Sequence, residues 1–145
     1  MRRNISSGSP YEDVFGYCRA VRVGNTVHVA GTVAQPPNVS GCDAYQQTAA
    51  ALEIIADALD RAGSGPADVV RTVTYVTDIA DMELVARAHH AMFASIKPAS
   101  TLVEVSALID PELKVEIEAY AIIDDEPVPR SGIRGRLGAR RSPTR

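Results

Sequence analysis

GYCRAVRVGNTVHVAGT, residues 16–32, is the stretch of sequence that decides the fold. It contains two runs rich in β-branched residues, at 17–23 and 26–32, on either side of Gly24 and Asn25. Glycine and asparagine accept a positive φ, which a tight hairpin turn requires. The sequence therefore predicts a domain that opens with a β-hairpin.

Two amphipathic helices are predicted after this hairpin. Asp43 and Gln46 have the spacing of an N-cap and its reciprocal side chain, and apolar residues then recur on one helical stripe as far as residue 62. The second helix is expected from Asp81, as its N-cap, to Lys97, because the proline at position 98 cannot continue a helix.

Three further strands complete the predicted domain, at residues 69–77, 101–105 and 113–123. The resulting order is β-β-α-β-α-β-β. Two helices on one face of a mixed sheet form an α+β sandwich, which is the fold class that we expect.

The other face of this sheet is left uncovered. If Val27 and Val29 face the helices, His28 and Ala30 face away, and the alternation of the last strand puts its polar residues on the same uncovered side: Glu116, Glu118 and Tyr120. Small proteins often close such a mixed face by self-association. We therefore look for function in clefts between subunits.

Two ionisable groups on this face carry alternative interpretations. His28 has the chemistry of a general base, although a lone histidine on a strand is more often a packed, hydrogen-bonded residue. Glu116 and Glu118 lie two apart on a strand and point the same way, so burial together would raise a pKa. They either orient a water molecule or form a solvated face.

The net charge of −3 on 145 residues is the sum of two opposite parts. Residues 4–126 contain 18 acidic and seven basic residues, whereas residues 127–145 contain six arginines and no acid. We expect one domain at 11–124, between a flexible N-terminus at 1–10 and a disordered basic tail at 125–145. A nucleic-acid arm is the alternative interpretation of that tail; the acidic core disfavours nucleic acid elsewhere.

Common cofactor and metal motifs are absent from the sequence. It has no G-x-S-x-G, GxGxxG, Walker lysine or H-E-x-x-H, and Cys18 and Cys42 match no zinc or redox spacing. We therefore expect no metal, no cofactor and two free thiols. Without a secretory signal or an apolar membrane span, the predicted location is the cytoplasm, with no membrane partner.

Four stretches of the chain share their order and spacing with a known family. They are GYCRAVRVGNTVHVAGT, DVVRTVTYVTDIADMELV, PASTLVEVS and KVEIEAYA, within residues 16–122. In this combination the chain resembles the Rid family, the YjgF-like reactive-intermediate deaminases. The resemblance implies a chorismate-mutase-like fold, a homotrimer whose sheets pack into a barrel, and a small-molecule pocket at each subunit interface. It also implies hydrolysis of 2-imino or 2-enamino acids without metal or cofactor.

The resemblance assigns roles to five positions. Tyr17 matches the family's pocket tyrosine, and Glu116 matches the glutamate that positions water, so both are catalytic candidates. Three substrate-binding positions depart from the family: Ser100 replaces the arginine that binds the substrate carboxylate, Ala86 replaces an asparagine and Ala30 replaces a serine. Serine cannot form the bidentate charged pair of arginine, so the chain resembles the arginine-lacking branches of the family.

Arg19 is a candidate replacement for that missing cation. It lies two residues after Tyr17 on the predicted strand and therefore projects to the same face. The alternative is that Arg19 pairs with an acid at the subunit interface.

Three functions follow from these observations. The first is hydrolytic deamination of a small imine or enamine, which Tyr17 and Glu116 favour. The second is non-catalytic binding of a metabolite, which the substitutions at Ala30, Ala86 and Ser100 favour. The third is an RNA-binding or endoribonuclease role through the basic tail, because proteins of this family are also labelled endoribonucleases.

Overall fold

The structure is a computed structural model that describes residues 1–124, and the predicted basic tail at 125–145 lies outside the described residues. In chain order its elements are β1 (Arg2–Ile5), α1 (Tyr11–Phe15), β2 (Ala20–Val23), β3 (Thr26–Thr32), α2 (Ala44–Arg61), the 3₁₀ turn η1 (Pro66–Asp68), β4 (Val69–Val76), the 3₁₀ turn η2 (Ile79–Asp81), α3 (Met82–Phe93), β5 (Ala99–Glu104) and β6 (Val115–Ile122).

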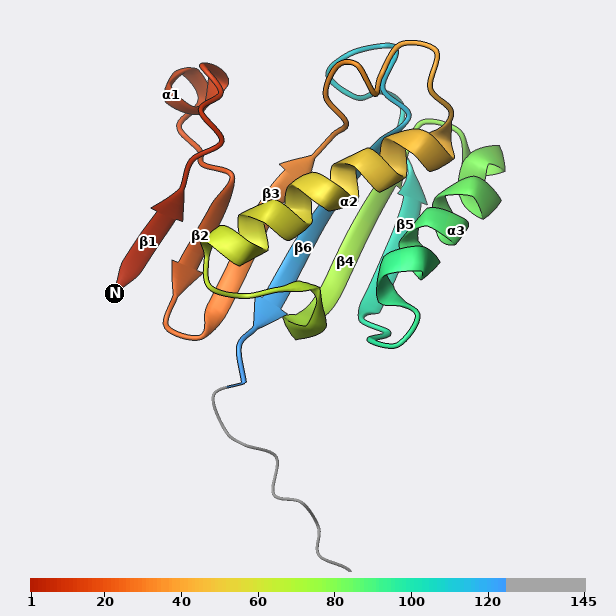
Figure 1. Cartoon of the computed structure of the whole chain (residues 1–145). Helices are drawn as coiled ribbons and strands as arrows, with labels where there is room; N and C mark the ends of the chain where they lie inside the picture. Colours follow the sequence, from red (N-terminus) through yellow and green to blue (C-terminus); the bar gives the residue numbers. More distant parts are fainter. Residues whose placement is uncertain (125–145) are drawn as a thin grey trace, which may run out of the picture.

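The strands form one mixed sheet in the order β1-β2-β3-β6-β4-β5 (Figure 1). The last strand, β6, lies in the middle and pairs antiparallel with both β3 and β4. Only the β4–β5 pair is parallel among the described strands, and α3 makes the crossover between them. Helices α2 and α3 lie on one face of the sheet (Figure 1), which confirms the predicted α+β class.

Helix α2 begins where the sequence predicts. The Asp43 side chain accepts a hydrogen bond from the Gln46 backbone N–H at 2.9 Å, and the Gln46 side chain accepts one from the Asp43 N–H at 2.9 Å. This reciprocal pair satisfies two donors that have no partner within the helix.

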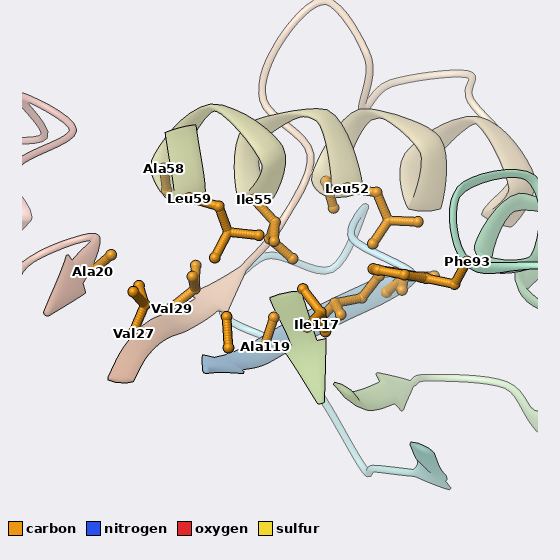
Figure 2. Close-up of a cluster of buried hydrophobic side chains, with 14 of the residues drawn as sticks. Ala20, Val27, Val29, Leu52, Ile55, Ala58, Leu59, Phe93, Ile117 and Ala119 are labelled. Atoms are coloured by element: carbon orange, nitrogen blue, oxygen red, sulfur yellow. The ribbon is translucent and has the colours of Figure 1, made fainter. Parts of the chain in front are cut away.

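The core lies between α2 and the covered face of the sheet (Figure 2). Leu52, Ile55 and Leu59 point from α2 onto the sheet, and each is at most 1% exposed. They pack over alternate residues of β3 and β6, namely Val27, Val29, Ile117 and Ala119. Between these positions His28 is exposed and Glu116, Glu118 and Tyr120 are half-buried, so the predicted alternation of both strands is correct.

The N-terminus differs from the flexible segment expected over residues 1–10. Arg2–Ile5 form β1, which pairs antiparallel with β2, and Ile5 is only 7% exposed. Glu12 in α1 accepts hydrogen bonds from Ser6 and Ser7, which ties the following residues to this helix. Strand β1 has four residues and one buried apolar side chain, so its sequence shows no alternation that would predict a strand. Its ordered backbone comes from pairing with β2.

The second long helix ends earlier than predicted. Helix α3 ends at Phe93, not Lys97, because the N–H groups of Ile96 and Lys97 both donate to the Phe93 carbonyl and close a turn. Lys97 then adopts a left-handed conformation with φ 53°. The proline at position 98 predicts that the helix ends before it, but it does not predict how many residues lie in the turn between the helix and the proline. The first predicted strand likewise begins at Ala20 and not at Tyr17.

Candidate functional site

Glu116 lies on the uncovered face of β6 and is packed against the backbone of β3. The β3–β6 register shifts between Val29 and Thr32, and Gly31 lies in this irregular stretch. A Cβ atom at Gly31 would be 2.5 Å from Glu116 Oε1, closer than any normal contact. A side chain at position 31 would displace the Glu116 carboxylate, so glycine lets this carboxylate lie against β3, a close approach that the sequence does not reveal.

Arg19 contacts both Gly31 and Tyr17. Its Nη2 donates to the Gly31 carbonyl at 2.7 Å, and its guanidinium carbon lies 5.8 Å from the centroid of the Tyr17 ring. The Ala30 N–H donates to the Arg19 carbonyl at 2.9 Å. The structure thus brings four of the six predicted site residues, Tyr17, Arg19, Ala30 and Glu116, to one end of β3. We call Tyr17, Arg19, Gly31 and Glu116 the Glu116 cluster.

The electrostatics of the cluster suit proton transfer. Burial raises the pKa of Glu116 above its ordinary value; the positive charge of Arg19 partly offsets this, and the nearby Glu118 adds to it. A carboxyl group whose pKa is raised accepts a proton more readily near neutral pH than an ordinary glutamate does. Arg19 Nε is buried and has no hydrogen-bond partner among the described residues.

Removing the Arg19 charge is expected to raise the pKa of Glu116 further, since that charge favours the ionised form. In Arg19→Met, the titration of the Glu116 carboxyl carbon followed by NMR should move to higher pH. Arg87→Met, at an exposed position on α3, is the matched control and should leave it in place. An unchanged or lower Glu116 pKa in Arg19→Met would show that Arg19 does not act on this carboxylate.

Glu118 and its neighbours form a separate network on the same face. The Tyr75 hydroxyl donates to Glu118 Oε1 at 2.7 Å, and this hydrogen bond raises the pKa of Tyr75 to about 12. His28 packs edge to face against Tyr120, with ring centroids 5.2 Å apart. Glu118 is therefore engaged by tyrosine, whereas Glu116 faces Gly31 and Arg19.

Ser100 and Ala86 lie together at another place, in a cavity of about 360 Å³ between α3 and β5. Thr72 Oγ1 lies 2.7 Å from Ser100 Oγ and 2.8 Å from His89 Nε2, which makes a hydrogen-bonded chain from the cavity into the sheet. Burial lowers the pKa of His89, so the imidazole is neutral at pH 7.

Sequence reasoning did not identify Thr72 or His89 as part of a site. The signal was available in β4, where the alternation that buries Val76 also puts the polar Thr72 and Thr74 under the helices. Buried hydroxyls need partners, so a polar residue on the covered face of a strand predicts a hydrogen-bonded contact there.

The two groups of predicted site residues do not meet within one chain. The Glu116 cluster is built at the β2–β3–β6 side of the sheet and on its uncovered face. Ser100 is on β5, at the opposite edge, and its hydroxyl contacts the fully buried Thr72 on the covered side. Arg19 and Ser100 are therefore separated by β3, β6 and β4 in the monomer.

Within residues 1–124, no three His, Cys, Asp or Glu side chains gather in a group that could hold a metal ion. Cys18 and Cys42 are both free thiols. No helix in this part of the chain has the length and apolar character needed to cross a membrane.

Comparisons with known proteins point to one family. The sequence model of the Endoribonuclease L-PSP family matches residues 10–123. An uncharacterized protein of Streptomyces coelicolor is 38% identical over 122 residues, covering 81% of this chain and 91% of the relative. The 2-iminobutanoate/2-iminopropanoate deaminase of Homo sapiens is 32% identical over 126 residues, covering 84% and 90%. The crystal structure of Rv2704 from Mycobacterium tuberculosis, described as a member of the YjgF/YER057c/UK114 family, superposes with a TM-score of 0.80 at 49% identity, covering 85% of this chain and 100% of Rv2704.

Proposed function

Because the chain belongs to the Endoribonuclease L-PSP family of YjgF-like proteins, we propose that it hydrolyses a small imine or enamine to a carbonyl compound and ammonia. The family includes relatives named 2-iminobutanoate/2-iminopropanoate deaminase. The observation that carries the proposal is the Glu116 carboxylate, half-buried against Gly31 with Arg19 beside it and its pKa raised.

The chemistry needs one group that accepts a proton and later returns it. Glu116 takes a proton from a water molecule as the oxygen attacks the imine carbon, which gives a tetrahedral carbinolamine. The same proton passes to the nitrogen, which becomes the –NH2 group of the carbinolamine. Glu116 then carries the hydroxyl proton to that nitrogen, and the C–N bond breaks to release ammonia as the carbonyl forms. A carboxyl whose pKa lies closer to the working pH serves both steps better than an ordinary one. We assign Tyr17, whose ring centroid lies 5.8 Å from the Arg19 guanidinium carbon, a further polar contact with the substrate through its hydroxyl.

We also propose that two copies of the chain complete the site, within a homotrimer whose uncovered sheet faces pack together. The separation of the Glu116 cluster from Ser100 and Ala86 supports this proposal, because one chain does not unite them. Light scattering should give three times the chain mass of 15.5 kDa; a monomer would contradict the shared site.

Non-catalytic binding of a metabolite is the alternative that a specific observation favours. Ala30, Ala86 and Ser100 lack the polar or charged groups that the family resemblance implies at these positions. A binding protein would keep the cavity beside Ser100 and show no rate enhancement.

The endoribonuclease name of the family is the second alternative. Residues 4–126 carry an excess of eleven negative charges, which opposes phosphate binding, so RNA affinity would have to come from residues 127–145. Affinity that persists after removal of residues 127–145 would contradict this charge argument.

The proposed reaction is tested with 2-iminobutanoate and 2-iminopropanoate, generated in situ from the amino acids. The wild-type protein should release 2-oxo acid faster than buffer does, as measured with a coupled dehydrogenase. Rates equal to those in buffer for both imines, and for an uncharged imine, would overturn the enzymatic proposal in favour of metabolite binding.

A further inference from the structure

The cavity between α3 and β5 has an uncompensated positive charge. Lys97, His89 and His90 line it together with Ser100, and no carboxylate of the described residues does so. Most of the other lining side chains are apolar, among them Val85, Ala86, Phe93 and Leu102. Lys97 itself is exposed, and a cation at the cavity with no carboxylate beside it favours an anionic ligand.

Lys97 is held at the cavity by an unusual backbone. Its φ of 53° is left-handed, and it is the one described non-glycine residue with a positive φ. The conformation is fixed by the hydrogen bond from its N–H to the Phe93 carbonyl at 2.8 Å and by the proline that follows. Glycine would adopt this backbone without strain, so the lysine is present at a conformational cost. Its ammonium has no ion pair with any described residue.

Ser100 contributes a fixed but neutral group to the same cavity. Its hydroxyl lies 2.7 Å from the Thr72 hydroxyl, and Thr72 is fully buried and bonded to His89. The contact with Thr72 orients the Ser100 hydroxyl, which carries no charge. A carboxylate in this cavity would therefore need a cation from another residue, and among the described residues of one chain Lys97 is the lysine or arginine that lines the cavity.

We propose that Lys97 binds the carboxylate of a small 2-imino or 2-oxo acid in this cavity, with the Ser100 hydroxyl as its second contact. The inference rests on the proposed function, since it names the substrate class of that same site. In this proposal the cation that binds the carboxylate is at position 97, three residues before position 100, where the family resemblance implies an arginine. Lysine offers a point charge in place of the fork of arginine, so the carboxylate is held with less geometric restriction.

The binding test uses 2-oxobutanoate and its uncharged counterpart 2-butanone, titrated into the full-length protein by NMR. Lys97→Met should weaken 2-oxobutanoate binding by at least about tenfold, the worth of one charged hydrogen bond, and leave 2-butanone unaffected. Lys97→Arg should restore the affinity. Lys114→Met, a lysine outside the cavity, is the matched control and should bind both as the wild type does.

Lys97→Gly separates binding from folding. Glycine suits the left-handed backbone, so the melting temperature should be equal or higher while 2-oxobutanoate affinity falls as in Lys97→Met. Unchanged affinity in both variants would overturn the proposal.

The same measurements distinguish this inference from the proposed function. If the wild type hydrolyses 2-imino acids and Lys97→Met has an unchanged KM and 2-oxobutanoate affinity, only the Lys97 assignment fails. If the wild type has no activity but binds 2-oxobutanoate through Lys97, the proposed reaction fails and the carboxylate site stands.

Discussion

Replacing Glu116 by glutamine is expected to lower kcat for imine hydrolysis about 100- to 10,000-fold, the range typical for loss of a general acid–base group. The amide has nearly the same shape and still fits beside Gly31, but it cannot take the proton of the attacking water. Substrate binding depends on other contacts, so KM should change little. The measurement is steady-state release of 2-oxo acid.

Unfolding cannot account for this loss. Burial raises the pKa of Glu116 in the folded protein, so the protonated form is favoured by folding and the ionised form is disfavoured. The contribution of Glu116 to stability is therefore present at low pH and lost as the pH rises through its raised pKa. At pH 7, a neutral glutamine should leave the melting temperature equal or higher.

Glu118→Gln is the matched control for this prediction. Glu118 lies on the same strand and face, and the substitution removes the same charge, but its carboxylate is occupied by the Tyr75 hydroxyl. Its turnover should stay within a few-fold of the wild type, about the effect of weakening one hydrogen bond. Equal losses in both variants would mean that the charge of the face, and not the position of Glu116, supports the reaction.

The framework of the fold could be predicted from residue patterns because each pattern has a local physical cause. The Asp43–Gln46 spacing marks the start of α2, and strict alternation in β3 and β6 separates the covered face from the open one. Elements without such causes were missed: β1 has one buried side chain, and α1 buries none. Their order comes from pairing with β2 and from side-chain hydrogen bonds to Glu12, which periodicity cannot show.

The site could be predicted in part. Tyr17, Arg19, Ala30 and Glu116 come together because they are close in the hairpin or on its neighbouring strand, β6. The contact of Arg19 with the Gly31 carbonyl required knowledge of the register shift in β3. The Thr72–His89 contact joins residues that are 17 positions apart in the sequence. The position of Lys97 depends on helix α3, which ends four residues earlier than predicted. Such contacts follow from packing, which local sequence does not encode.

The second large effect follows from the proposal that the Glu116 cluster of one copy and the α3–β5 cavity of another copy form one site. Ala86→Trp should fill the cavity between α3 and β5, since Ala86 is exposed on α3 and lines it. This variant should be inactive because it blocks one half of the site, whereas Glu116→Gln is inactive because it lacks the other. Each variant retains the half that the other has lost, so oligomers that contain both can form intact sites.

Co-expression of Glu116→Gln and Ala86→Trp in equal amounts, followed by the 2-iminobutanoate assay on purified mixed oligomers, tests the central claim most directly. With random assembly, about one quarter of the interfaces combine two intact halves, so about one quarter of wild-type activity is predicted. The two variants purified separately and assayed together without subunit exchange provide the baseline. Activity of the mixed oligomers no higher than that baseline would contradict a hydrolytic site shared between two copies of the chain.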